Sequence, residues 1–93
     1  MTQYYNKKGV LISGGRWSTL YNNIKYRTIA ENTLNNKLTV RTQWIGFDYT
    51  FAGDTPRVFE SIVYNKTGVD YQRYESLKAA KQGHLNLVER WTS

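Results

Sequence analysis

The sequence predicts an α+β domain in which a short N-terminal helix and a C-terminal amphipathic helix accompany an antiparallel β-meander of about four to six strands. Two runs rich in β-branched and aromatic residues flank a short loop in the middle of the chain, which is a hairpin signal. Turn residues separate further strand-like runs on both sides of this hairpin. Apolar residues near the C-terminus instead recur at helical spacing, so we expect that helix to pack on the sheet.

Size and composition indicate one globular domain, residues 1–93. The chain is 40% hydrophobic and 15% aromatic, so ring side chains can supply much of a core that a chain this short otherwise lacks. It contains no Cys, which excludes disulfides, thiolate metal sites and cysteine nucleophiles. No apolar run approaches the roughly 20 residues of a transmembrane helix. The N-terminus lacks the apolar segment of a signal peptide, so we expect an intracellular protein without a membrane partner.

A small hairpin is predicted at residues 4–12, because Asn6 opens a turn and Gly9 can take the left-handed conformation that closes it. Residues 13–15, Ser-Gly-Gly, then break the strand and offer a helix N-cap. Their likeness to a phosphate-binding loop is confined to this fragment, because the full glycine pattern and its Lys are missing. One face of the short helix that follows is formed by four residues at i, i+3, i+4 and i+7: Trp17, Leu20, Tyr21 and Ile24.

Residues 26–34 and 37–51 are predicted as consecutive strands, joined by a tight turn in which Asn35 and Asn36 suit positive φ. Alternation in the second strand puts Leu38, Val40, Thr42 and Trp44 on one face and Arg41 and Gln43 on the other. Beyond Gly46 the apolar set changes face, to Ile45, Phe47, Tyr49 and Phe51. Since a regular strand does not switch faces, we expect a bulge near Gly46.

The chain returns in a strand at residues 57–64, turns at 65–68 and forms a last strand at 69–74. Ser76 is the expected N-cap of the C-terminal helix. The apolar stripe of this helix comprises Leu77, Ala80, His84, Leu87 and Trp91, widened by Leu85 and Val88. His84 is the only histidine and has no second ligand at helical spacing, so we expect a hydrogen-bonded core residue and no metal site.

The formal net charge of +6 favours anionic partners, although a soluble domain can carry such a charge without function. Arg41 and Gln43 project from the face opposite the apolar set, and guanidinium groups suit phosphate and carboxylate. Asp48 and Glu60 lie on adjacent hairpin strands, where they could act as acid and base or pair with Arg41 or Arg57. The candidate binding residues, for a partner or an anionic ligand, are Arg27, Arg41, Gln43, Trp44, Asp48, Tyr49, Arg57, Glu60 and Arg73.

One family resemblance is carried by the core Trp44-Ile45-Gly46-Phe47-Asp48, by Phe51, and by the return segment Pro56, Val58-Phe59-Glu60-Ser61-Ile62-Val63. With Tyr4-Tyr5-Asn6, Trp17, Tyr26-Arg27, Tyr74 and Gly83-His84, these segments resemble a small protein family common in bacteriophage genomes. Its members share a W-x-G-x-D core and a P-x-V-F-E-S-x-V return strand, and they have no assigned enzymatic role. Members often carry His after the Asp, where this chain has Tyr49, which puts any chemistry that needs that His in doubt. The resemblance implies expression in the cytoplasm of an infected bacterium.

Together these observations favour a non-enzymatic phage protein, without a cofactor, that antagonises a bacterial defence system. The most concrete form is a CRISPR–Cas inhibitor that occludes a host effector protein or its nucleic-acid complex, with Arg and aromatic anchors. A second hypothesis is a sponge for a nucleotide immune signal, acting as a homo-oligomer, with Arg41, Gln43, Tyr49 and Arg57 around the ligand. A third is a nucleic-acid-binding phage regulator. An enzyme would depend on Asp48 and Glu60 alone.

Overall fold

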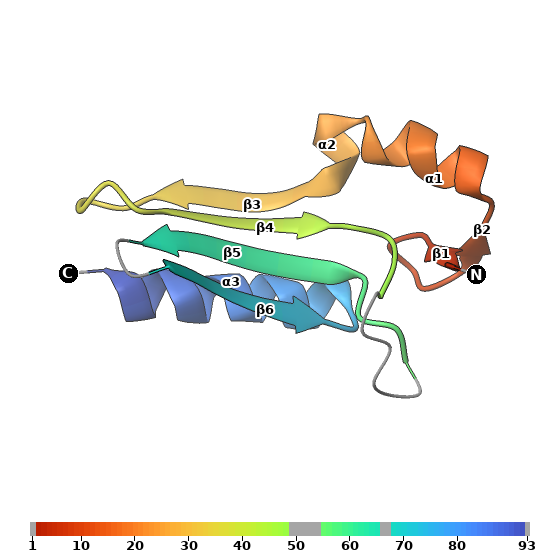
Figure 1. The fold of residues 1–93 in the computed structure, drawn as a ribbon. Coiled ribbons are helices and arrows are strands. Elements are labelled where there is room, and N and C mark those ends of the chain that lie inside the picture. Colours follow the sequence, from red (N-terminus) through yellow and green to blue (C-terminus); the bar gives the residue numbers. More distant parts are fainter. Residues whose placement is uncertain (1, 49–54, 66–67, 93) are drawn as a thin grey trace.

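The computed structural model describes residues 2–48, 55–65 and 68–92 and confirms the α+β class. A four-stranded antiparallel sheet has the order β3-β4-β5-β6, and β1 and β2 form a separate two-stranded sheet (Figure 1). The elements are β1 (Tyr4–Tyr5), β2 (Leu11–Ile12), α1 (Gly14–Tyr21), α2 (Ile24–Arg27), β3 (Thr28–Thr33), β4 (Thr39–Trp44), β5 (Phe59–Asn65), β6 (Gly68–Tyr74) and α3 (Leu77–Trp91).

The N-terminal hairpin and first helix form as the sequence predicts. Asn6 Oδ1 accepts hydrogen bonds from the amides of Lys8 and Val10, and Gly9 has a φ of +79°. Ser13 caps α1 by accepting from the amide of Arg16. The Ser-Gly-Gly fragment therefore serves as a helix cap.

The segment after α1 differs from the prediction. Asn23 caps a second short helix by accepting from the amide of Tyr26, so Tyr26 and Arg27 are helical and the strand begins only at Thr28. The axis change between α1 and α2 also leaves Ile24 exposed, off the apolar face on which we had placed it. The cause is local. The Asn23 side chain accepts a hydrogen bond from a backbone amide at the start of α2, and this cap favours a new helix where the sequence pattern indicated a strand.

The β3–β4 turn and the end of β4 carry two irregularities. Positive φ falls on Lys37, at 69°, instead of on Asn35 or Asn36. Asn36 instead accepts from the amide of Leu38 and donates to the carbonyl of Trp91, which ties the turn to the end of α3. At the other end of the strand, the amides of Ile45 and Gly46 both donate to the Val58 carbonyl, at 2.8 and 3.2 Å. Two donors opposite one acceptor is the hydrogen-bond pattern of a bulge, as predicted near Gly46.

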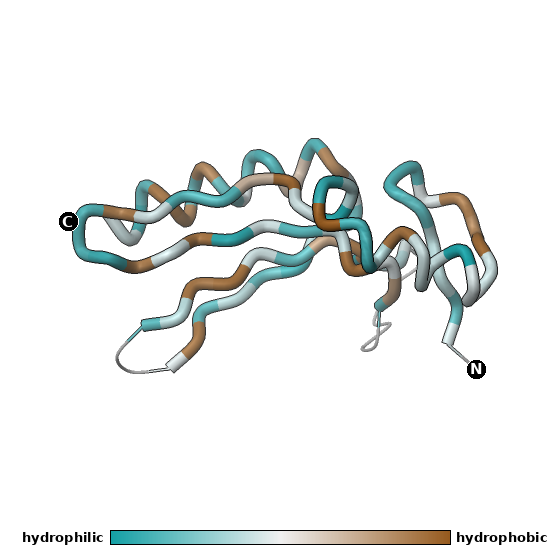
Figure 2. The backbone as a smooth tube through the Cα atoms, turned by 90° about the horizontal axis from the view of Figure 1, so that it is seen from above, coloured by the Kyte–Doolittle hydropathy of each residue, from teal (hydrophilic) through white to brown (hydrophobic). Residues whose placement is uncertain are grey.

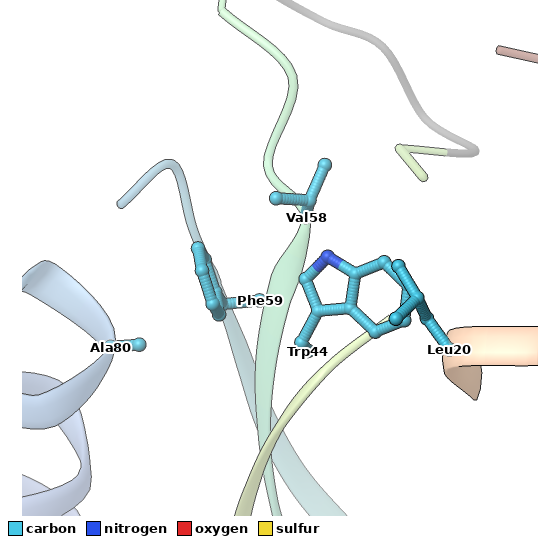
Figure 3. Close-up of a cluster of buried hydrophobic side chains, with 5 residues drawn as sticks. All are labelled: Leu20, Trp44, Val58, Phe59 and Ala80. Carbon is cyan, nitrogen blue, oxygen red and sulfur yellow. The ribbon is translucent and has the colours of Figure 1, made fainter. Parts of the chain in front are cut away.

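The core lies on one face of the sheet, which α3 covers (Figures 1 and 2). Strand alternation sends Val40, Thr42 and Trp44 of β4 to this covered face, together with Phe59, Ser61 and Val63 of β5. One cluster comprises Leu20, Trp44, Val58, Phe59 and Ala80, with Trp44 between α1 and β5 (Figure 3). A second comprises Val40, Val63 and Leu87.

The helix stripe is largely as predicted, since Ala80, His84 and Leu87 are buried. Leu85 does not widen it: its side chain is exposed on the outer surface of α3. Gly83 lies on the buried side, where the ring of Tyr74 approaches so closely that an added Cβ would lie 2.2 Å from it. Only glycine lets α3 and β6 meet at this distance.

Candidate functional site

The face of the four-stranded sheet that points away from α3 is the principal candidate site, and we call it the open face. Strand register places alternating side chains of all four strands there, and none of the described helices covers them. They include Glu31 and Thr33 of β3, Thr39, Arg41 and Gln43 of β4, Glu60, Ile62 and Tyr64 of β5, and Val69, Tyr71 and Arg73 of β6.

Four apolar residues meet at the β5–β6 side of the open face and form what we call the apolar patch: Ile62, Tyr64, Val69 and Tyr71. Ile62 lies opposite Tyr71, and Tyr64 lies opposite Val69, so each pair is in direct cross-strand contact range. Tyr64, Val69 and Tyr71 are 67%, 51% and 55% exposed. Neighbouring exposed apolar side chains on one surface are typical of an interaction site.

The β3–β4 side of the open face is polar. Arg41 Nε lies 2.7 Å from Glu31 Oε1, and both side chains are largely exposed. Between these strands and β5 lies a hollow of about 390 Å³, of the size that accommodates a small ligand. Its lining residues are Glu31, Thr33, Thr39, Arg41, Gln43, Ile62 and Tyr64. The structure thus brings Arg41 and Gln43 together, as predicted, but next to a carboxylate.

One end of the open face contains a buried charge cluster of Asp48, Arg57, Glu60 and Arg73. The Asp48 side chain is 1% exposed and accepts from the backbone amide of Arg57 at 3.0 Å. Its carboxylate also lies 3.4 Å from Arg57 Nε and 3.9 Å from Arg73 Nη1. Arg73, 4% exposed, reaches Glu60 with Nε at 3.8 Å from Oε1. The two carboxylates are therefore bridged by a guanidinium, an arrangement that favours a structural role over acid–base chemistry.

Burial dominates the electrostatics of this cluster. It raises the pKa of Glu60, and a hydrogen bond from Gln43 partly opposes that shift. Burial also lowers the pKa of Arg73, with Asp48 acting in the opposite direction. Arg57 remains one-third exposed and lines a second surface hollow with Tyr71, Gln72 and Arg73.

Trp44 was expected to anchor a partner, and the structure corrects this prediction. The residue is fully buried, and its indole Nε1 donates to the carbonyl of Tyr5. Trp17 donates in the same way to the carbonyl of Ile45. Gly46, at φ +83°, lies between the two indoles, where an added Cβ would be 2.5 Å from Trp17 and 2.7 Å from Trp44. The Trp-Ile-Gly-Phe-Asp motif therefore joins the sheet to the N-terminal elements.

Two other predicted residues lie elsewhere. Arg27 belongs to α2, with its guanidinium carbon 4.8 Å from the centre of the Tyr21 ring, and not to a strand beside Arg41. Tyr49 lies outside the described residues.

The apolar patch was not among the predicted site residues. Its signal was present in the sequence, because residues 62–64, Ile-Val-Tyr, are apolar on both faces, whereas a strand with one solvated face alternates.

His84 forms part of a buried hydrogen-bond chain, as expected of a core histidine. Its Nε2 donates to Asn32 Oδ1 at 2.7 Å, so Nδ1 of the neutral ring accepts from Thr42 Oγ1, also at 2.7 Å. Thr42 in turn contacts the hydroxyl of Ser61. A hydroxyl, an imidazole and an amide linked in this order resemble a nucleophile, its base and the group that orients the base. Thr42 and Ser61 are fully buried, however, so no substrate reaches them in this conformation.

Among residues 2–48, 55–65 and 68–92, no group of three or more His, Asp or Glu side chains could hold a metal ion. No helix in this described part of the chain is both long and apolar enough to cross a membrane. Comparisons with protein-family models, with curated proteins and with solved structures found no match.

Proposed function

We propose that this chain is a non-enzymatic binding protein that acts through its open face. The supporting observation is the apolar patch, which stays exposed on a sheet whose opposite face is packed. Burying Tyr64, Val69 and Tyr71 against a partner would release apolar surface from water without changing the fold. Tyr is also a residue type that is enriched among the strongest contacts of protein interfaces.

The partner we propose is an effector protein of a bacterial defence system, with a CRISPR–Cas effector as the most concrete case. The resemblance to phage proteins motivates this choice. The charges on the open face make a protein the better fit than nucleic acid, because Arg41 and Arg73 lie beside Glu31 and Glu60. An apolar patch flanked by paired charges suits a protein interface, in which polar groups border an apolar core.

Co-expression with a CRISPR–Cas system tests this proposal. Interference against a targeted plasmid should be lost with the wild-type chain and retained with Tyr64→Glu, which puts a charge in the centre of the patch. Leu85→Glu, an equally exposed change on the outer surface of α3, is the matched control and should still block interference. Purified effector should co-migrate with the wild type and not with Tyr64→Glu. Absence of both effects with every effector type tested would refute the proposal.

The hollow beside Arg41 supports a second candidate, a sponge for a nucleotide signal. Arg41, Gln43 and two threonine hydroxyls could hold phosphate oxygens, with Tyr64 stacking on a base. Protein incubated with a candidate nucleotide, desalted and then heat-denatured should release material that absorbs near the nucleotide band. Arg41→Ala should release none, and Lys78→Ala on α3 should release as much as wild type. A clean spectrum from the wild type would exclude this candidate for each nucleotide tried.

Direct binding to nucleic acid is distinguished by its salt dependence. Affinity that falls steeply between low and physiological salt would favour the regulator hypothesis over both candidates above.

A further inference from the structure

The two edges of the four-stranded sheet differ in how well they are protected against pairing with another strand. The β3 edge carries a register shift between Thr28 and Ala30 and an exposed Glu31. A bulge and an outward charge are devices by which proteins prevent edge-to-edge association. The β3 edge is therefore protected.

The β6 edge lacks these devices. All seven residues of β6, Gly68–Tyr74, pair with β5 without a register shift, and no described strand pairs with the other side of β6. The strand contains neither Pro nor Lys. Its two charged residues are held within the molecule: Asp70 by Trp91 and Arg90, and Arg73 by Asp48 and Glu60. A regular seven-residue edge of this kind is a template for another strand.

We propose that β6 pairs with β6 of a second copy of this chain, antiparallel and about a two-fold axis through Tyr71, so that two four-stranded sheets become one. This inference goes beyond the proposed function and does not depend on it. A second copy is the occupant because an antiparallel edge is self-complementary, and two-fold dimers are the commonest closed assemblies. Pairing extends the sheet at its edge, so the open face of each copy remains exposed.

Register follows from the pleat. Two directly opposed residues must point to the same face of the joined sheet. The two-fold axis must therefore pass through a residue and not between two residues. Tyr71 is the middle residue of β6, and an axis there uses the whole strand. With this axis, Tyr71 lies opposite Tyr71 of the second copy, and Val69 lies opposite Arg73, all on the open face. On the covered face, Asp70 lies opposite Gln72.

These pairs fit chemically. Aromatic residues directly opposite each other stabilise antiparallel pairing, and no two like charges meet. The Gln72 amide can donate to the Asp70 carboxylate. Leu87 packs against Val40 and Val63, and α3 also reaches β6, where Gly83 contacts Tyr74 and Trp91 donates to Asp70. The pairing uses the backbone groups of β6 that point away from β5 and not the face that α3 covers. The apolar patches of the two copies become neighbours across the axis.

The molecular mass in solution tests the pairing. Over a hundredfold range of concentration, light scattering should reveal a species of twice 10.9 kDa for the wild type. Tyr71→Glu and Tyr71→Lys should each be monomeric, because like charges oppose at the axis. Mixed in equal amounts, they should form a heterodimer. Tyr64→Glu is the matched control: Tyr64 is an exposed tyrosine of the same face on the interior strand β5, so this variant should remain dimeric.

Cross-linking keeps the proposal testable if the charged variants fail to fold. The chain has no native Cys, so a single introduced thiol reports on its own position. Directly opposed Cα atoms lie about 4.5–5.5 Å apart, within disulfide range. Oxidised Tyr71→Cys should form a covalent dimer and Tyr64→Cys should not. A monomeric wild type at every concentration would overturn the inference. Equal loss of dimer in Tyr64→Glu and Tyr71→Glu, or preferential cross-linking at position 64, would assign the contact to the open face and overturn it as well.

Discussion

The two faces of the four-stranded sheet are built by the same strands, yet they follow different rules. The covered face is packed: Trp44, Phe59 and Leu87 are buried there, and its polar groups Thr42, Ser61 and His84 are joined by hydrogen bonds. The open face carries exposed tyrosines and ion pairs, of which Arg41–Glu31 is largely solvated. Alternation along each strand separates these environments by a single residue. The comparison indicates that the packing that stabilises the fold is concentrated on one face, while the other leaves apolar and charged side chains exposed.

The largest difference between the faces should appear on truncating an aromatic residue. Trp44→Ala on β4 removes a fully buried ring and should cost about 3–5 kcal/mol of unfolding free energy. Tyr64→Ala on β5 removes a ring that is mostly solvated and should change stability by only about 0.5 kcal/mol. Chemical denaturation of both variants measures the contrast. Equal losses would mean that the open face is covered by part of this molecule.

A smaller effect is expected from adding one methyl group to the side of α3 that packs on the covered face. Gly83→Ala places a Cβ against the Tyr74 ring and should destabilise by about 1–3 kcal/mol, although alanine is normally the better helix former. Gly15→Ala in α1 is the matched control, because an added Cβ there meets nothing within 4 Å. It should leave stability unchanged or raise it by up to about 1 kcal/mol. Thermal melts of the two variants, shifted in the same direction, would contradict the close contact between α3 and β6.

The smallest effect is a dependence of stability on pH that originates in the covered face. Burial lowers the pKa of His84 below its usual 6.5, so the unfolded chain binds a proton at a higher pH than the folded chain. The stabilisation is present above pH 6.5 and is lost as the pH falls toward the folded-state pKa. Its slope is at most about 1.4 kcal/mol per pH unit.

Glu60 on the open-face side has the opposite sign. Its raised pKa means that the folded chain holds the proton longer, so its contribution is largest below pH 4.5 and is lost as the pH rises through the folded-state pKa. Denaturation between pH 5.5 and 8 should therefore give a slope that His84→Gln flattens. Glu60→Gln serves as the comparison variant and should not flatten the slope, because Glu60 contributes to it with the opposite sign. A His84→Gln variant with the wild-type slope would assign the titration to another group.

Much of the fold could be predicted from local sequence because local chemistry decides it. Ser13 and Ser76 cap helices, and alternation in β4 separates Val40 and Thr42 from Arg41. Local signals misled where they competed. Asn23, expected inside the first helix, instead caps α2, and positive φ passes from the asparagines to Lys37. In each case a side-chain hydrogen bond to a nearby amide selected the backbone conformation.

The candidate site could be predicted only in part. Arg41 and Gln43 share the open face, as the pattern indicated. The sequence could not show that Trp44 is inaccessible, because an aromatic residue at the end of a strand is equally suited to a core or to an interface. Nor could it show that Arg73 bridges Asp48 and Glu60, since the three residues lie in separate segments that only the fold brings together.

By itself, the sequence determined the α+β class, the helix caps at Ser13 and Ser76, the bulge at Gly46 and the burial of His84. These features follow from residue spacing and from short-range hydrogen bonds, which act over a few residues. Only the tertiary structure decided which edge of the sheet stays unprotected and which charges neutralise one another. Such features depend on the packing of segments far apart in the chain, and no single segment determines the free energy of that packing.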